Sequence, residues 1–146
     1  MINSLKFLTL VALLSIFACN NDKEEQQKLQ KVVIDKHDVL MAKMDSLTEN
    51  QLRLDSITLK YKKIKVENPN LDSNTLIAQI DSAKNLLSNA DEAMMNWMQQ
   101  FNPDYTGKSS TEIFDYLRKQ EQKIDSVKTL FDKSLAHSNA LIQQYK

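Results

Sequence analysis

Helix-breaking residues are rare in this chain of 146 residues, and they fall at only two places. Pro69 stands at the first place, and Pro103 and Gly107 stand at the second; the chain has no other proline or glycine. These breakers leave three long uninterrupted stretches after the N-terminal segment. Tight turns and phosphate-cradling loops need residues that adopt positive φ, which glycine does most readily. The sequence therefore excludes a glycine-rich nucleotide loop, and it carries no β-hairpin signal.

Apolar residues recur in each stretch at alternating spacings of three and four, which is typical of helices with a heptad seam. This pattern predicts helices over residues 26–66, 73–101 and 110–144. The first seam consists of Val33, His37, Leu40, Met44, Leu47, Gln51, Leu54, Thr58 and Tyr61. The second consists of Leu76, Ile80, Ala83, Leu87, Ala90, Met94, Trp97 and Phe101. The third consists of Ile113, Leu117, Gln120, Ile124, Val127, Phe131, Ser134, Ser138, Leu141 and Tyr145, and it is supported by Phe114, Leu130 and Leu135.

The connections between these helices are short, and short connections make neighbouring helices antiparallel. Ser109 and Glu112 have the spacing of a capping box at the start of the third helix. We therefore expect an all-α fold, an up-down-up antiparallel three-helix bundle with coiled-coil-like seams. Its single domain spans residues 37–146, and residues 1–18 form a separate signal segment.

The positions of the two turns predict a register. A first turn centred near residue 69 or 70 places residue i opposite residue 139 − i of the second helix. A second turn near residue 105 or 106 places residue i of the second helix opposite residue 211 − i of the third. In this register residues 19–36 lie past the end of the second helix. We therefore expect them to form a polar, partly helical tether outside the core.

Methionines gather in one layer of the predicted bundle. Residue 41 faces residue 98, and residue 44 faces residue 95, so that sulfur atoms from two helices approach one another. Thioether and imidazole groups are soft enough to bind Cu(I), and Trp97 can line such a site through a cation–π contact. The candidate metal ligands are His37, Met41, Met44, Met94 and Met98.

An ordinary core is the alternative for this layer, because methionine fills gaps and packs well against aromatic rings. The residue types resemble those of small envelope copper chaperones, in which Met and His bind Cu(I) beside a tryptophan face. That likeness is confined to side-chain types, because those chaperones are β-barrels. A haem is disfavoured because a three-helix bundle is narrow for a porphyrin. The interpretation that needs no cofactor is core packing, and Cu(I) is the alternative.

The N-terminal segment has the features of an export signal. Lys6 precedes an apolar run from Phe7 to Phe17, which is too short to span a bilayer. The segment Leu14-Ser15-Ile16-Phe17-Ala18-Cys19 resembles a bacterial lipobox, with Phe17 in place of the usual small or β-branched residue. The resemblance implies that residues 1–18 are removed and that Cys19, the only cysteine, is lipidated. We therefore expect a membrane-anchored protein of the cell envelope, at the outer membrane of a Gram-negative bacterium.

Lysines crowd the end of the first predicted helix, the end farthest from the expected anchor. Lys60, Lys62, Lys63 and Lys65 lie in the last turns before Pro69. Cations at a helix C-terminus interact favourably with the helix dipole, which accounts for them without a partner. Contact with an anionic wall polymer or a partner protein is the alternative.

Composition and motifs favour a protein that is not an enzyme. After removal of residues 1–18 the chain has 18 basic and 19 acidic side chains, so nothing favours nucleic-acid binding. His37 adjoins Asp38 and His137 adjoins Ser138, but neighbouring positions on a helix point in different directions, which argues against a catalytic relay.

The pattern His37-Asp38-x-x-Met41-x-Lys43-Met44, together with the run from Ala90 to Met98, resembles small helical bacterial lipoproteins, some of which are labelled viral A-type inclusion protein. The resemblance implies no activity. We therefore expect an interaction or scaffold module with an envelope protein as its partner. A homodimer through Leu29, Val32 and Val33 is an alternative partnership.

Overall fold

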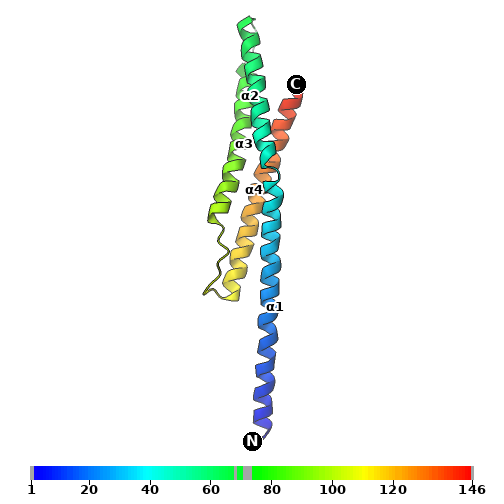
Figure 1. The fold of residues 1–146 in the computed structure, drawn as a ribbon, viewed down its shortest axis with the longest axis vertical. Coiled ribbons are helices and arrows are strands. Elements are labelled where there is room, and N and C mark those ends of the chain that lie inside the picture. Colours follow the sequence, from blue (N-terminus) through cyan, green and yellow to red (C-terminus); the bar gives the residue numbers. More distant parts are fainter. Residues whose placement is uncertain (1, 68, 71–73, 146) are drawn as a thin grey trace.

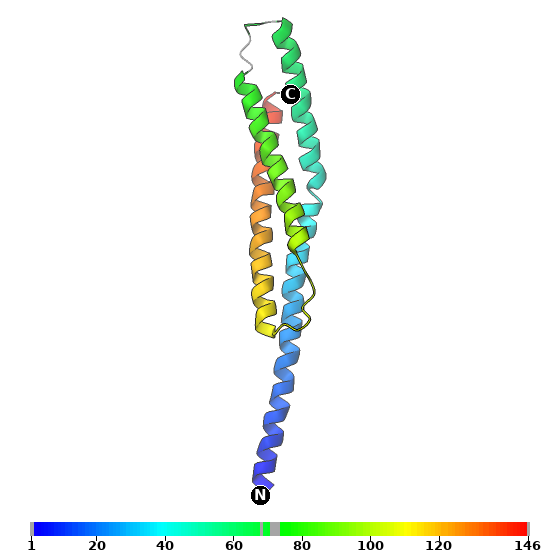
Figure 2. The same ribbon diagram turned by 90° about the vertical axis from the view of Figure 1, so that its left-hand side faces the viewer.

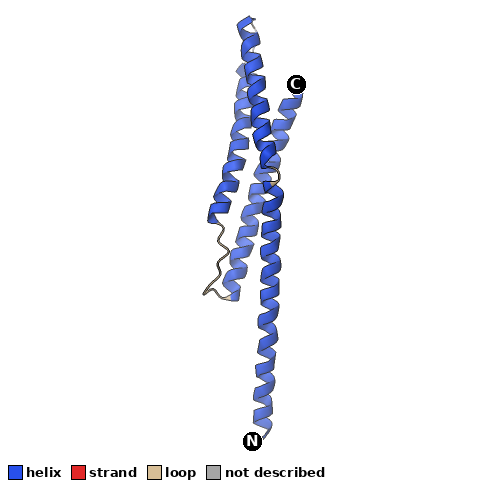
Figure 3. Ribbon diagram, in the orientation of Figure 1, coloured by secondary structure: helices blue, strands red, loops and turns tan. Residues whose placement is uncertain are grey.

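Four helices form from the breaker-free stretches, in an arrangement that confirms the all-α antiparallel three-helix bundle (Figure 1). They are α1 (Ile2–Met41), α2 (Met44–Glu67), α3 (Asn74–Gln100) and α4 (Ser110–Gln144). The computed structural model describes residues 2–67, 69–70 and 74–145; for residues 2–21, 64 and 67 it describes the backbone only. The described residues contain helices and loops and no strand (Figure 3).

The first predicted helix is in fact two helices, α1 and α2, which follow one another along one long rod (Figure 2). A turn at Ala42 and Lys43 separates them. The amide of Lys43 donates to the carbonyl of Leu40 at 2.9 Å, a three-residue bond that tightens the backbone locally. The prediction of one unbroken helix over residues 26–66 was wrong here because neither proline nor glycine marks the break.

The predicted seams of α3 and α4 are the buried rows of these helices. Every member from Leu76 to Trp97 in α3 is buried, and so is every member from Ile113 to Leu141 in α4, including the polar Gln120, Ser134 and Ser138. In α2 the row is wider than the prediction. Asn50 and Ile57 are buried beside Leu47 and Leu54, because α2 packs against both α3 and α4.

The predicted register between the first rod and α3 is confirmed along α2. Three side-chain contacts join residues whose numbers add to 139: Lys65 with Asn74, Asp55 with Lys84, and Gln51 with Ser88. The turn between α2 and α3 is therefore centred where Pro69 predicts it. The hydrogen bonds that fix this register lie on the flank of the α2–α3 contact.

The predicted register of α4 was wrong, because the connection after α3 is extended instead of tight. Residues 101–109 run as a loop between Gln100 and Ser110, and an extended residue covers about twice the length of a helical one. As a result α4 begins nearer to the N-terminal end of the first rod than expected. The prediction placed residue 110 beside residue 38, whereas the hydroxyl of Ser110 donates to Asp22 at 2.9 Å and accepts from Gln26 at 2.7 Å.

This shift also corrects the predicted tether over residues 19–36. From Asp22 onward α1 packs against α4, and Val33 is fully buried in the core. The described part of the bundle therefore starts near residue 22 instead of residue 37. Val33 cannot contribute to the homodimer contact that the sequence suggested, whereas Val32 remains exposed on the outer side of α1.

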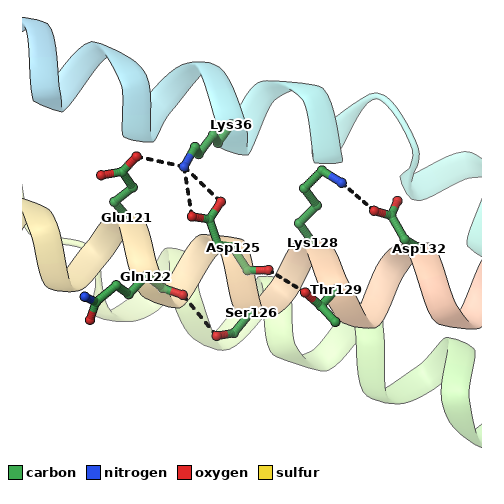
Figure 4. A network of polar contacts seen from close by, with 8 residues as sticks. All are labelled: Lys36, Glu121, Gln122, Asp125, Ser126, Lys128, Thr129 and Asp132. Carbon is green, nitrogen blue, oxygen red and sulfur yellow. Dashed lines mark hydrogen bonds and ion pairs between the residues drawn. The ribbon is translucent and has the colours of Figure 1, made fainter.

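A polar ladder joins α1 to the parallel helix α4 (Figure 4). Lys36 contacts Glu121 and Asp125 at 2.8 and 2.9 Å. Partial burial lowers the pKa of Lys36, but hydrogen bonds to these two carboxylates outweigh burial and hold the pKa above its ordinary value. A lysine pKa that folding raises stabilises the fold below the unfolded pKa, and this contribution is lost as the pH rises through the folded pKa. The contact therefore holds at neutral pH.

The predicted capping box starts α4. The side chain of Ser109 accepts from the amide of Glu112, and the carboxylate of Glu112 accepts from the amide of Ser109 at 2.8 Å. The amide and the hydroxyl of Ser109 both donate to this carboxylate, and these two hydrogen bonds lower the pKa of Glu112. Gly107, at φ +77°, supplies the left-handed residue that the turn before this cap requires.

Candidate functional site

Five rings form a continuous row where α3 ends, and we call this row the aromatic cluster: His37, Trp97, Phe101, Tyr105 and Tyr116. The His37 ring stacks on Trp97 with centroids 5.4 Å apart, and Trp97 stacks on Phe101 at 5.0 Å. Phe101 lies 6.2 Å from Tyr116, which meets Tyr105 edge-on at 6.0 Å. The cluster therefore ties α1, α3, the loop 101–109 and α4 together at the end of the bundle opposite Pro69.

The extended loop places the outer rings of this cluster. Asn102 accepts from the amide of Asp104 at 2.9 Å, and Asp104 accepts from Thr106, so that two short side-chain turns follow one another. The amide of Asn102 donates to the hydroxyl of Tyr116 at 2.7 Å. Burial of its hydroxyl and the nearby Tyr116 raise the pKa of Tyr105. The loop thus presents Phe101 and Tyr105 to one ring of α4.

Three buried polar atoms in or beside the cluster have no hydrogen-bond partner among the described residues: Trp97 Nε1, Tyr105 Oη and Gln120 Oε1. Trp97 belongs to the buried row of α3 and Gln120 to the buried row of α4. An indole N–H only donates and an amide oxygen only accepts. The described residues therefore leave one buried donor on α3 and one buried acceptor on α4 that do not bond to each other.

The predicted metal ligands occupy different environments. His37 is about one-fifth exposed and lies against Trp97, as the sequence predicts. Met94 is fully buried, and Met44 and Met98 are half-buried against the core. Met41 is more exposed than these, with 37% of its surface accessible. The structure thus brings His37 to the face of Trp97, whereas the four methionines range from fully buried to exposed.

The expectation that His37 and Asp38 point apart was wrong. The Nδ1 atom of His37 lies 2.9 Å from the Asp38 carboxylate, because two short side chains on adjacent positions can bend toward each other along the helix surface. The imidazole is thereby held at its Nδ1 atom by Asp38 and at one face by Trp97. This contact orients the ring, and it does not join a nucleophile to a base.

The side chain of Cys19 lies outside the described residues. Among the described side chains, no group of three or more His, Cys, Asp or Glu residues has a geometry that could hold a metal ion. In the same part of the chain no helix combines the length and the apolar character needed to cross a membrane.

No protein-family model, no curated protein and no solved structure matches this chain.

Sequence reasoning found the centre of the aromatic cluster but missed its rim. Trp97 and Phe101 belong to the predicted seam and His37 to the candidate ligands, whereas Tyr105 and Tyr116 entered no prediction. Tyr116 lies seven residues after Ser109 on the cap side of α4, and only the path of the loop brings Phe101 to it. An aromatic residue between Pro103 and Gly107 is the one signal that could have indicated a packed loop.

Proposed function

We propose that this chain is a non-enzymatic, lipid-anchored protein of the cell envelope whose helical bundle serves as an interaction or scaffold module. The anchor is Cys19, within the lipobox-like segment, and the location is the outer membrane of a Gram-negative bacterium. The partner that the bundle presents itself to is an envelope protein or surface.

The observation that carries this proposal is the row of apolar side chains that the bundle leaves uncovered on its first rod. Val32 and Val39 on α1, and Leu52, Leu59 and Val66 on α2, are all exposed and repeat at seven-residue spacings within their helices. The core already uses the opposite side of the same helices. A heptad-spaced row on the outside of a packed bundle is typical of a surface that meets another helix or an interface.

Lipidation at Cys19 can be tested directly in a bacterial host. We expect metabolic labelling with radioactive palmitate to mark the chain and fractionation to place it with membranes. Cys19→Ser should abolish the label and leave residues 1–18 attached, which mass spectrometry detects. Ser15→Ala, in the same segment, should keep both the label and the cleavage. A label that persists in the Cys19→Ser variant would contradict the anchor.

Soft-metal binding in the envelope is the second candidate function, and the stacking of His37 on Trp97 favours it. That contact places an imidazole beside the segment of α3 that carries Met94 and Met98. Imidazole and thioether groups together suit Cu(I). In this candidate function His37, Met94 and Met98 hold the ion, and Met41 and Met44 approach from the first rod.

A titration separates Cu(I) binding from core packing. If the site exists, the folded chain should take Cu(I) from a chromogenic competitor, and Met41→Leu with Met98→Leu should weaken binding at least tenfold. The same double variant should lower the free energy of unfolding by less than about 1.5 kcal/mol, because leucine replaces methionine at similar volume. Met95→Leu is the matched control on the exposed side of α3. Cu(I) that stays with the competitor rules out the metal candidate.

A further inference from the structure

The end of α2 farthest from Cys19 carries an unbalanced positive charge, and we call residues 59–66 the distal tip (Figure 1). Between Asp55 and Glu67 the sequence has four lysines and no acidic residue. Lys60, Lys62 and Lys63 are exposed, and none of them forms an ion pair or hydrogen bond among the described residues.

The fourth lysine of the tip, Lys65, donates to Asn74, which is a neutral amide. Lysines elsewhere in the bundle more often meet carboxylates. Those with an acidic partner are Lys28, Lys31, Lys36, Lys43, Lys84 and Lys128. Among the described residues, the distal tip therefore concentrates positive charge that no carboxylate neutralises.

The same tip exposes the most accessible large apolar side chains of the described residues. Val66 is 82% exposed and Leu59 is 68% exposed. Leu59, Lys62, Lys63 and Val66 stand at positions i, i+3, i+4 and i+7, so they share one face of the helix. Tyr61, which packs edge-on against Tyr145 with centroids 5.6 Å apart, lies on the inner side. The outward face thus combines lysines with aliphatic side chains.

We propose that the distal tip docks on the surface of a bilayer that contains anionic phospholipids. The lysines bind lipid phosphates, while Leu59 and Val66 enter the boundary between headgroups and acyl chains. Helices that lie on membranes combine cationic and apolar residues in this way. A soluble polyanion would use the lysines but not the aliphatic side chains, and a parallel second copy would bring like charges together.

This inference deepens the proposed function, because it names the partner of the end opposite the anchor. Asp22 and Val66 are separated by about 65 Å at the rise of an α-helix. A protein held at Cys19 could therefore contact a second surface at that distance. Docking by the tip does not itself require lipid on Cys19, and the experiment below does not depend on lipidation.

The test orients the full unlipidated chain by coupling the thiol of Cys19, the only cysteine, to beads. Dye-labelled vesicles of phosphatidylcholine alone, or with about a quarter of phosphatidylglycerol, are then added. We expect capture of the anionic vesicles, little capture of the neutral ones, and loss of capture at high salt. The triple variant Lys60→Gln, Lys62→Gln, Lys63→Gln should weaken capture about 100-fold, since each lysine near an anionic surface contributes about fivefold.

Two further variants make the result specific. Lys119→Gln, Lys123→Gln and Lys133→Gln remove the same charge from exposed positions of α4 and should change capture less than about threefold. Leu59→Ser with Val66→Ser should weaken capture about tenfold, because the aliphatic contact is lost. If the tip lysine variant captures anionic vesicles as well as the original chain, the proposal fails. If the serine variant is unchanged and soluble polyphosphate elutes the vesicles, the tip binds polyanions and not a bilayer surface.

Discussion

Replacing Phe131 with alanine should lower the free energy of unfolding by about 3–5 kcal/mol, the range measured for large-to-small changes in cores. Phe131 lies on α4, and it is the largest of the fully buried side chains among the described residues. Its neighbour Asp132 bonds to Lys43 at 3.0 Å, so Phe131 lies level with the break between α1 and α2. At this level the backbone of the first rod is interrupted, so Phe131→Ala would open its cavity beside the turn at Ala42 and Lys43.

Chemical denaturation followed by circular dichroism and by Trp97 fluorescence provides the measurement. Trp97 is the only tryptophan, and it reports on the aromatic cluster through its contact with His37. We expect both signals of Phe131→Ala to shift together to lower denaturant, as in a single cooperative transition. Leu130→Ala is the matched control, because Leu130 is 39% exposed on the same helix and its loss should cost less than about 1 kcal/mol. An equal loss in both variants would contradict this account, because alanine has the higher helix propensity at both positions and burial is what distinguishes them.

The sequence predicted the fold well wherever a single row of residues decides it. In α3 the seam from Leu76 to Trp97 is buried without exception. The polar members Ser134 and Ser138 of α4 were also placed correctly. Ser138 accepts from Asn50 at 2.9 Å, so this polar seam position holds a buried hydrogen bond between α2 and α4.

Two parts of the structure could not be predicted because local sequence does not encode them. The break after Met41 has no proline or glycine, and its tightened turn is set by how α1 and α2 pack against α4. The loop 101–109 contains the expected breakers. Its extended path depends on the hydrogen bond from Asn102 to Tyr116 and on the capping of α4 by Ser109. That extension moved α4 along the first rod, which brought residues 22–36 into the bundle and Tyr116 into the candidate site.

Part of the candidate site could be predicted from the positions of the turns. The register along α2 was correct, so the approach of His37 to Trp97 followed from it approximately. The register does not give the burial of each methionine. Met41 lies next to the buried seam residue Leu40 and is exposed, whereas Met94 is itself a seam residue and is fully buried. Residue spacing therefore gives the layer in which a side chain lies more reliably than the direction in which it points.

Replacing Trp97 should separate the role of its ring from that of its N–H group. Trp97→Ala should lower the free energy of unfolding by about 3–4 kcal/mol, because the ring stacks between His37 and Phe101 and is almost fully buried. Trp97→Phe should cost less than about 1 kcal/mol. It keeps an aromatic ring in the stack and removes a buried donor that has no partner, which offsets the lost volume.

Denaturation followed by circular dichroism measures both variants, since neither retains a tryptophan. Gln120→Leu supplies the matching change on α4, because it removes a buried acceptor without a partner among the described residues and should leave stability unchanged or raise it by about 1 kcal/mol. A loss of 2 kcal/mol or more in both Trp97→Phe and Gln120→Leu would contradict this account of the layer. It would mean that the indole N–H and the Gln120 amide each bond to buried water, and that the aromatic cluster is held by hydrogen bonds as well as by packing.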